Sequence, residues 1–154
     1  MTARLLPLLA LASAGCYDRI DALDPMVGDP IVERCANTDS DPDEEVSFSN
    51  EILPVLKKQN VPVGCSCHQP SDPNPIGLEQ AGLDLSGYDA LLRGGNNSKS
   101  AIVVPGQPCD SVLWQKVSAG PPFGARMPFN GPPFLDDETR RKFSDWIAEG
   151  ARDN

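Results

Sequence analysis

The sequence predicts a small all-α domain of about four short helices joined by long loops rich in proline and glycine. No stretch of any length alternates like a half-buried strand, whereas four separate segments have the apolar spacing of a helix. The chain of 154 residues contains 16 prolines and 13 glycines, which indicates many turns. This length suits one domain, and we place its boundaries at residues 46–154.

The first helix is expected in the segment SFSNEILPVLKKQ, ending near Asn60. Ser47 or Ser49 can cap it. Pro54 then falls within about the first turn, where the missing N–H of a proline costs little. The buried face of this helix would consist of the apolar residues Ile52, Leu53, Val55 and Leu56.

Two more helices are expected in the middle of the domain. Residues 69–77, QPSDPNPIG, are predicted to be a proline-rich loop without regular structure. The segment LSGYDALLRGG would then be helical between a Ser86 cap and the Gly94–Gly95 pair. The segment CDSVLWQKV would form the next helix, with Asp110 or Ser111 as its cap. Its inward-facing side chains would be Val112, Leu113 and Trp114.

The last helix has the strongest local pattern. Asp136 can cap it, the carboxylates of Asp137 and Glu138 favour its positive end, and Gly150 can end it. The apolar face of this helix would contain the large residues Phe143, Trp146 and Ile147. Since the signals at both ends agree with the apolar spacing between them, this is the best-defined element of the sequence.

The N-terminus is typical of an export signal. The stretch MTARLLPLLALASAGC has one basic residue, a short apolar run, and then small residues that end in Cys16. SAGC resembles the end of a bacterial lipoprotein signal, whose cysteine is lipidated and becomes the first residue of the mature chain. We therefore expect residues 1–15 to be removed and Cys16 to anchor a periplasmic or outer-membrane lipoprotein. A plain secretory signal that leaves Cys16 as a thiol is the alternative.

Most of the negative charge precedes the domain. Residues 17–45 contain ten acidic and two basic residues, and the formal net charge of the whole chain is −9. A segment with so much like charge and so little apolar surface does not order itself, so residues 16–45 are expected to be a flexible acidic tether. A calcium loop is the alternative for TDSDPDEE, although the segment lacks the central glycine of such loops. The net charge argues against nucleic acid as a partner.

The segment VGCSCHQP contains two of the five cysteines, Cys65 and Cys67, and the only histidine, His68. A cysteine next to a histidine can attach haem, bind a metal ion, or belong to a disulfide framework. Export would permit both disulfides and covalent haem attachment. A haem would also organise the long loops of a small helical domain, because its faces and edges replace missing core side chains.

Residues 46–151 resemble the c-type cytochrome domains of exported bacterial proteins. The segments that carry the resemblance are, in order, FSNEILPVL, CSCHQP, GLDLSGYDALLRGG, IVVPGQPCDSVLWQKV, RMPFNGPPFLDDE and FSDWIAEGA. That family has a helix before a Cys-x-x-Cys-His site, a later Met-Pro ligand loop and a final helix. The resemblance implies a monohaem cytochrome c-like domain that exchanges single electrons with another redox protein, and thus a carrier rather than an enzyme.

By this resemblance, His68 and Met127 would bind the iron of one c-type haem, and cysteine sulfur would form thioether bonds to the haem vinyl groups. Cys67 directly precedes His68, as the second cysteine of the family motif does. The first cysteine would stand at Gly64, but the nearest cysteine is Cys65, one position too close. We therefore expect a single thioether through Cys67, with a second one through Cys65 as the alternative.

A haem-free domain on the same fold is a second hypothesis. Without haem and with Cys16 lipidated, Cys35, Cys65, Cys67 and Cys109 are an even number of thiols, which suits two disulfides. A bridge between Cys65 and Cys67 would be strained, so each would pair with Cys35 or Cys109 in a disulfide-stapled structural or interaction lipoprotein. With haem on Cys67, the other three cysteines would form one disulfide and leave one thiol.

A metal site without haem is a third hypothesis. Cys, His and Met are copper ligands, but copper sites usually draw on two histidines and this chain has one. Cys65, Cys67, His68 and Cys109 are enough ligands for zinc, although the one-residue gap between the first two is short. Acid–base or nucleophilic catalysis has little support, because any Ser-His-Asp or Cys-His arrangement would have to use His68.

Overall fold

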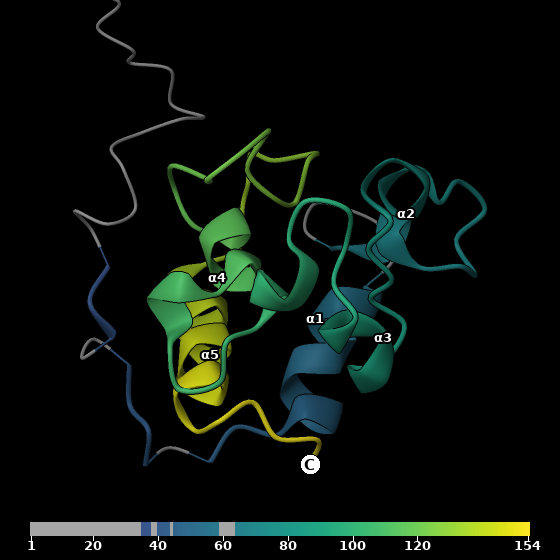
Figure 1. Ribbon diagram of the computed structural model, residues 1–154. Helices are drawn as coiled ribbons and strands as arrows, with labels where there is room; N and C mark the ends of the chain where they lie inside the picture. Colours follow the sequence, from purple (N-terminus) through teal and green to yellow (C-terminus); the bar gives the residue numbers. More distant parts are fainter. Residues whose placement is uncertain (1–34, 38–39, 44, 59–63) are drawn as a thin grey trace, which may run out of the picture.

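The computed structural model describes residues 35–37, 40–43, 45–58 and 64–154 (Figure 1). These residues form helices and no strands, which confirms the predicted all-α class. No helix within the same ranges is long and apolar enough to cross a bilayer. The predicted leader, the predicted lipidation site Cys16, Asp39 of the alternative calcium loop and residues 17–34 of the predicted tether lie outside the described residues.

The first helical segment joins a π-helical stretch, η3 (Phe48–Ile52), to the helix α1 (Leu53–Lys57). Ser47 caps this segment, as predicted, and its side chain accepts a hydrogen bond from the backbone N–H of Asn50. Pro54 has no N–H to donate to the preceding turn, and that turn is wider than an α-helical one. The predicted end of this helix lies outside the described residues.

The middle of the chain contains the helices α2 (Ile76–Ala81), α3 (Tyr88–Leu92) and α4 (Val112–Val117). Helix α2 corrects the prediction that residues 69–77 lack regular structure. Pro75 occupies its N-cap, a position from which no N–H is needed for the helix, so the proline permits a helix directly after it. The described chain also contains the short 3₁₀ turns η4 (Ser66–His68), η5 (Lys99–Ile102) and η6 (Pro108–Asp110).

The caps of α3 and α4 differ from the predicted ones in detail. Gly87, not Ser86, precedes α3. Ser111 does precede α4, but its hydroxyl donates to the carbonyl of Gln107 at 2.9 Å and accepts from the N–H of Val104 at 2.8 Å. The Ser111 side chain therefore stabilises the loop before α4 instead of the first turn of the helix.

The helix α5 (Asp137–Ala148) agrees with its prediction at both ends. Oδ1 of Asp136 accepts a hydrogen bond from the backbone N–H of Thr139 at 2.7 Å, which is the interaction of an N-cap. Gly150 follows the helix with a φ of 102°, a conformation that favours glycine. The predicted apolar face is fully buried, with an exposed fraction of 0% for Phe143, Trp146 and Ile147.

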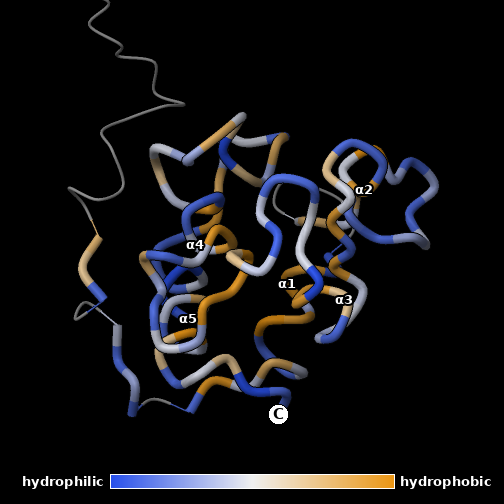
Figure 2. The backbone as a smooth tube through the Cα atoms, viewed as in Figure 1, coloured by the Kyte–Doolittle hydropathy of each residue, from blue (hydrophilic) through white to orange (hydrophobic). Residues whose placement is uncertain are grey.

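The hydrophobic core lies around α5, which contacts η3 and α4; Figure 1 shows α4 beside α5. Figure 2 shows hydrophobic stretches of α1, α4 and α5 gathered in the interior, with hydrophilic stretches along the outer loops. Phe48, Tyr88 and Trp146 form an aromatic cluster in this core, with ring centroids 5.3, 5.3 and 6.5 Å apart. The indole N–H of Trp146 donates to the carbonyl of Arg152 at 2.9 Å, so its one polar atom is satisfied.

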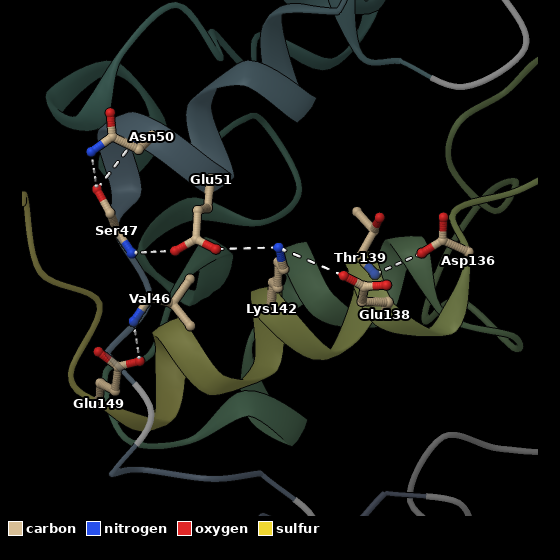
Figure 3. A network of polar contacts seen from close by, with 9 residues as sticks. All are labelled: Val46, Ser47, Asn50, Glu51, Asp136, Glu138, Thr139, Lys142 and Glu149. Atoms are coloured by element: carbon tan, nitrogen blue, oxygen red, sulfur yellow. Dashed lines mark hydrogen bonds and ion pairs between the residues drawn. The ribbon is translucent and has the colours of Figure 1, made fainter.

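Polar contacts hold the start of the first helical segment against α5 (Figure 3). The backbone N–H of Val46 donates to Oε1 of Glu149 at 2.8 Å. The backbone N–H of Ser47 donates to Oε2 of Glu51 at 3.0 Å, and the other oxygen of Glu51 lies 3.2 Å from Nζ of Lys142. Glu51 therefore joins its own helical segment to the outer face of α5.

The end of the predicted tether contacts the domain. Cys35 forms a disulfide with Cys109 in η6, and Oδ1 of Asn37 accepts a hydrogen bond from the Cys109 N–H at 2.8 Å. The backbone N–H of Asp41 donates to Oδ1 of Asp145 in α5 at 2.8 Å, and Asp145 is buried. The described part of residues 35–43 is thus bonded to η6 and α5. A flexible tether over the preceding residues stays a prediction.

Candidate functional site

The short turn η4 presents His68 in the interior, where the residue is only 5% exposed. The N–H of Leu85 donates to the carbonyl of His68 at 3.1 Å. The side-chain amide of Gln69, which is also buried, donates to the carbonyl of Leu85 at 2.7 Å and to that of Leu56 at 3.3 Å. These contacts fix η4 between the segment before α3 and the end of α1.

Among the described residues, one hydrogen bond orients the imidazole of His68. Its Nδ1 lies 3.1 Å from the carbonyl oxygen of Leu83. Because a carbonyl can only accept, Nδ1 carries the proton and Nε2 of the neutral ring keeps a free lone pair. Burial lowers the pKa of His68, the Leu83 carbonyl opposes this shift, and the positive charge of Lys116 lowers the pKa further. A neutral ring whose Nδ1–H is bonded to a carbonyl is the usual arrangement of a metal-binding histidine.

Two adjoining cavities lie beside this ring. The first has a volume of about 280 Å³ and is bounded by α4, the loop after it and residues between η4 and η5. The second has about 500 Å³ and is bounded by η4, α2 and the same loop. His68, Gln80, Ala81, Met127 and Phe129 line both cavities. Pockets that hold cofactors commonly measure about 300–1,000 Å³. The space around His68 is therefore large enough for a cofactor.

Met127 lies in the loop between α4 and α5, which occupies the same end of the domain as α2 (Figure 1). Its backbone N–H donates to the carbonyl of Lys116 at 2.7 Å, and its half-buried side chain packs against the hydrophobic core. The structure thus brings the two predicted iron ligands, His68 and Met127, to the same cavities although they are far apart in sequence.

The two cysteines of the motif border different cavities. Cys65 is buried and lines the first cavity, whereas Cys67 is half-buried and lines the second. Both are free thiols. Burial, with a smaller effect of the neighbouring Cys67, raises the pKa of Cys65 to about 12. Burial and the negative charge of Asp72 raise the pKa of Cys67, while the N–H of Gly77 opposes this rise. Each thiol is therefore protonated at neutral pH and next to cavity space.

The disulfide corrects the haem-free hypothesis. Cys35 is bonded to Cys109 across 74 positions of sequence, so the predicted pairing of Cys65 and Cys67 with these two residues is wrong. The zinc site of Cys65, Cys67, His68 and Cys109 is excluded as well, because a cysteine in a disulfide cannot provide a thiolate ligand. No group of three or more His, Cys, Asp or Glu side chains in the described ranges could hold a metal ion.

Helix α2 contributes a contact that the sequence did not reveal. A Cβ on Gly77 would lie 2.9 Å from Sγ of Cys67 and 2.9 Å from Nε2 of His68. Only glycine avoids contacts this short with the Cys67 sulfur and with the Cδ2–Nε2 edge of the His68 ring. Because α2 itself was not predicted, nothing in the sequence marked Gly77 or Gln80 as residues of the site.

Apolar side chains surround the cavities at the surface. Ile76, Phe123 and Phe129 are the large hydrophobic residues that are exposed in the described part of the chain, and each lines at least one cavity. Phe129 is the most exposed of them, at 71%. Clustered exposed apolar side chains usually mark a ligand or partner site.

Comparison with protein-family models matches residues 65–128 to the family described as Planctomycete cytochrome C. The match covers less than half of the chain, but it begins at Cys65 and extends one residue beyond Met127, so it contains the cysteine motif, α2 and the first part of the loop after α4. It supports a cytochrome c-like domain. Comparisons with curated proteins and with solved structures found no match.

Proposed function

We propose that this chain is an electron carrier that holds one haem c, attached through Cys67, with His68 and Met127 as the axial ligands of the iron. The bound haem would supply reversible one-electron redox chemistry. The observation that carries the proposal is that His68, with a free Nε2, and Met127 line the same cavities beside a free Cys67 thiol.

The residues around His68 suit the role of a proximal ligand. The Nδ1–H donates to the Leu83 carbonyl at 3.1 Å, which orients the ring and increases the basicity of Nε2. Gly77 keeps side-chain atoms away from Nε2. The fold itself holds the Leu83 carbonyl in place, because the backbone N–H of Leu85, two residues later, donates to the carbonyl of His68. The iron ligand would therefore be oriented before the haem arrives.

Met127 suits the role of the second axial ligand. Its thioether is uncharged, and Met–His ligation raises the reduction potential of a haem. With both axial positions filled by side chains, no iron position is left for a substrate, which favours a carrier over a catalyst. The apolar residues of the cavities, including Leu113 and Phe129, would exclude water from the porphyrin and limit reorganisation when an electron is transferred.

The cysteines favour one thioether through Cys67. Cys67 directly precedes His68 and lines the larger cavity. Cys35 and Cys109 pair with each other, so a haem on Cys67 leaves Cys65 as the single unpaired thiol of the described residues. This is the pattern of one disulfide and one thiol that the sequence predicts for a haem-bound domain.

We also propose that the domain works outside the cytoplasm, anchored by a lipid on Cys16 and exchanging electrons with a partner redox protein. The export-like N-terminus and the acidic residues that follow it support this placement. Cys16→Ala should move the protein from the membrane fraction to the soluble fraction with its spectrum unchanged. Wild-type protein that is soluble after export would contradict the anchor and leave the haem proposal intact.

Haem attachment is tested in a host that exports the chain and contains haem-attachment machinery. The wild type should show a Soret band and a haem-stained band that survives denaturing electrophoresis. The stained band should disappear in Cys67→Ala and persist in the matched variant Cys65→Ala. Loss of the band in Cys65→Ala alone would overturn the single-thioether assignment. A colourless wild type would overturn the proposed function.

A further inference from the structure

The loop that carries Met127 has little structure of its own. Residues 118–127, SAGPPFGARM, include two prolines and two glycines. No hydrogen bond joins two residues within 119–126, all of which the structure describes. The loop also places Phe123 at the surface instead of in the core. Its position therefore depends on contacts with other parts of the domain.

Lys116, near the C-terminal end of α4, contacts the second half of this loop. Its Nζ donates to the carbonyl of Phe123 at 2.7 Å and also to the carbonyl of Ala125. The same ammonium lies 5.0 Å from the centroid of the Phe123 ring, within the range of a cation–π interaction. The backbone carbonyl of Lys116 accepts the N–H of Met127 at 2.7 Å. One residue thus contacts the loop at three alternate positions.

The partly buried surroundings of Lys116 make the hydrogen bonds of its ammonium stronger than the same bonds would be at a solvent-exposed position. Lys116 is half-buried and lines the first cavity, and no described Asp, Glu, Arg or other Lys lines either of the two cavities. An ammonium removed from water is costly unless carbonyl or other acceptors surround it, and hydrogen bonds from a charged donor are stronger than neutral ones. A further hydrogen bond joins the loop to the end of α4, since Nε of Arg126 donates to the carbonyl of Val117 at 3.1 Å.

We propose that Lys116 is a positioning residue that holds the loop 118–127 against α4 and thereby keeps Met127 on the haem iron. This inference rests on the proposed function. Without the ammonium, the loop keeps the backbone bond to Met127 but loses its contacts at Phe123 and Ala125. Met127 should then leave the iron more often, and the loss of charge-assisted hydrogen bonds should change the ratio of Met-bound to Met-free protein about tenfold or more.

The test compares three variants of the full haem-loaded chain. Lys116→Leu keeps an apolar stem and removes the ammonium, while Lys116→Arg keeps a cationic donor. Lys57→Leu is the matched control, because Lys57 is an exposed residue of α1 that lines neither cavity. The readouts are the far-red band of a ferric haem with a Met ligand, carbon monoxide binding to the reduced protein, the reduction potential, and hydrogen exchange of the peptide that contains residues 118–127.

The expected pattern separates positioning from folding. Lys116→Leu should keep its covalent haem and Soret band, lose most of the far-red band, bind carbon monoxide at least about tenfold more strongly, show a lower potential, and exchange faster in residues 118–127. Lys116→Arg should restore part of each property, and Lys57→Leu should match the wild type. If Lys116→Leu does not fold, Lys116→Gln provides the same measurements.

The possible outcomes distinguish a failure of the inference about Lys116 from a failure of the proposed function. If Lys116→Leu keeps the far-red band and excludes carbon monoxide as the wild type does, the inference about Lys116 is wrong and the proposed function stands. If the wild type contains haem but no far-red band, Met127 is not a ligand and the inference fails with it. If the wild type contains no haem, the proposed function itself fails.

Discussion

Replacing Gly77 with alanine tests the contact between α2 and the Cys67–His68 motif. The added Cβ would lie 2.9 Å from Sγ of Cys67 and equally close to Cδ2 and Nε2 of His68. Non-bonded carbon contacts are optimal at about 3.5–4.0 Å, so the contacts with both side chains are too short by about 0.5 Å or more. The change therefore acts on the attachment sulfur and the proximal ligand together.

Two effects of this substitution on stability oppose each other. Alanine gains about 1 kcal/mol over glycine inside a helix, whereas an overpacked contact costs about 1–3 kcal/mol. The free energy of unfolding should consequently fall by between about zero and 2 kcal/mol. That loss is too small to unfold a typical domain. A marked loss of haem would then come from the displaced side chains and not from unfolding.

The assay measures the ratio of Soret to protein absorbance in exported protein, together with urea unfolding. Gly87→Ala is the control, because a Cβ at Gly87 meets no atom within 4 Å and its φ of −175° is ordinary extended backbone. We expect Gly77→Ala to fold but to carry far less haem than Gly87→Ala. A Gly77→Ala protein with the haem content and spectrum of the wild type would refute the placement of the haem site beside Gly77.

Three further predictions address the disulfide, the last helix and the second axial ligand. Replacing both Cys35 and Cys109 with serine should lower the free energy of unfolding by about 4.5 kcal/mol for a loop of this length, and an unchanged urea midpoint would contradict this prediction. Asp136→Ala should destabilise the protein at neutral pH. Because hydrogen bonds from Thr139 lower the pKa of Asp136, this contribution is present above the ordinary aspartate pKa and is lost as the pH falls through the lowered value, so wild type and variant should converge in acid. Met127→Leu should cost about 1.5 kcal/mol or less but remove the far-red band and admit carbon monoxide, and a variant that keeps the band would contradict axial ligation.

The parts of the fold that could be predicted are those with local signals. Helix α5 was recognisable because its cap Asp136 and its apolar face both lie within one continuous segment. Helix α2 was missed because the prolines before it are typical of a loop, and its contacts with η4 are tertiary. Ser111 was a correct helix boundary, but its hydroxyl bonds to the preceding loop, which propensity alone does not reveal.

The residues of the candidate site also fall into those that short sequence motifs mark and those that only the tertiary structure reveals. His68 and Met127 could be named because the family resemblance marks them within short motifs, and the structure places both at the same cavities. Gly77 and Lys116 could not, since their importance comes from the close approach of segments that are distant in sequence. The pairing of Cys35 with Cys109 likewise depends on their Cα separation of 5.7 Å, whereas counting cysteines leaves several pairings open.

The most direct test of the central claim is the mass of the peptide that contains Cys67, measured after export of the full chain from a host with haem-attachment machinery. The proposal predicts that this peptide carries the mass of one haem after denaturation, that Cys65 is recovered as a free thiol, and that the intact protein has a Soret band. A colourless protein with an unmodified Cys67 peptide and an intact Cys35–Cys109 disulfide would contradict it.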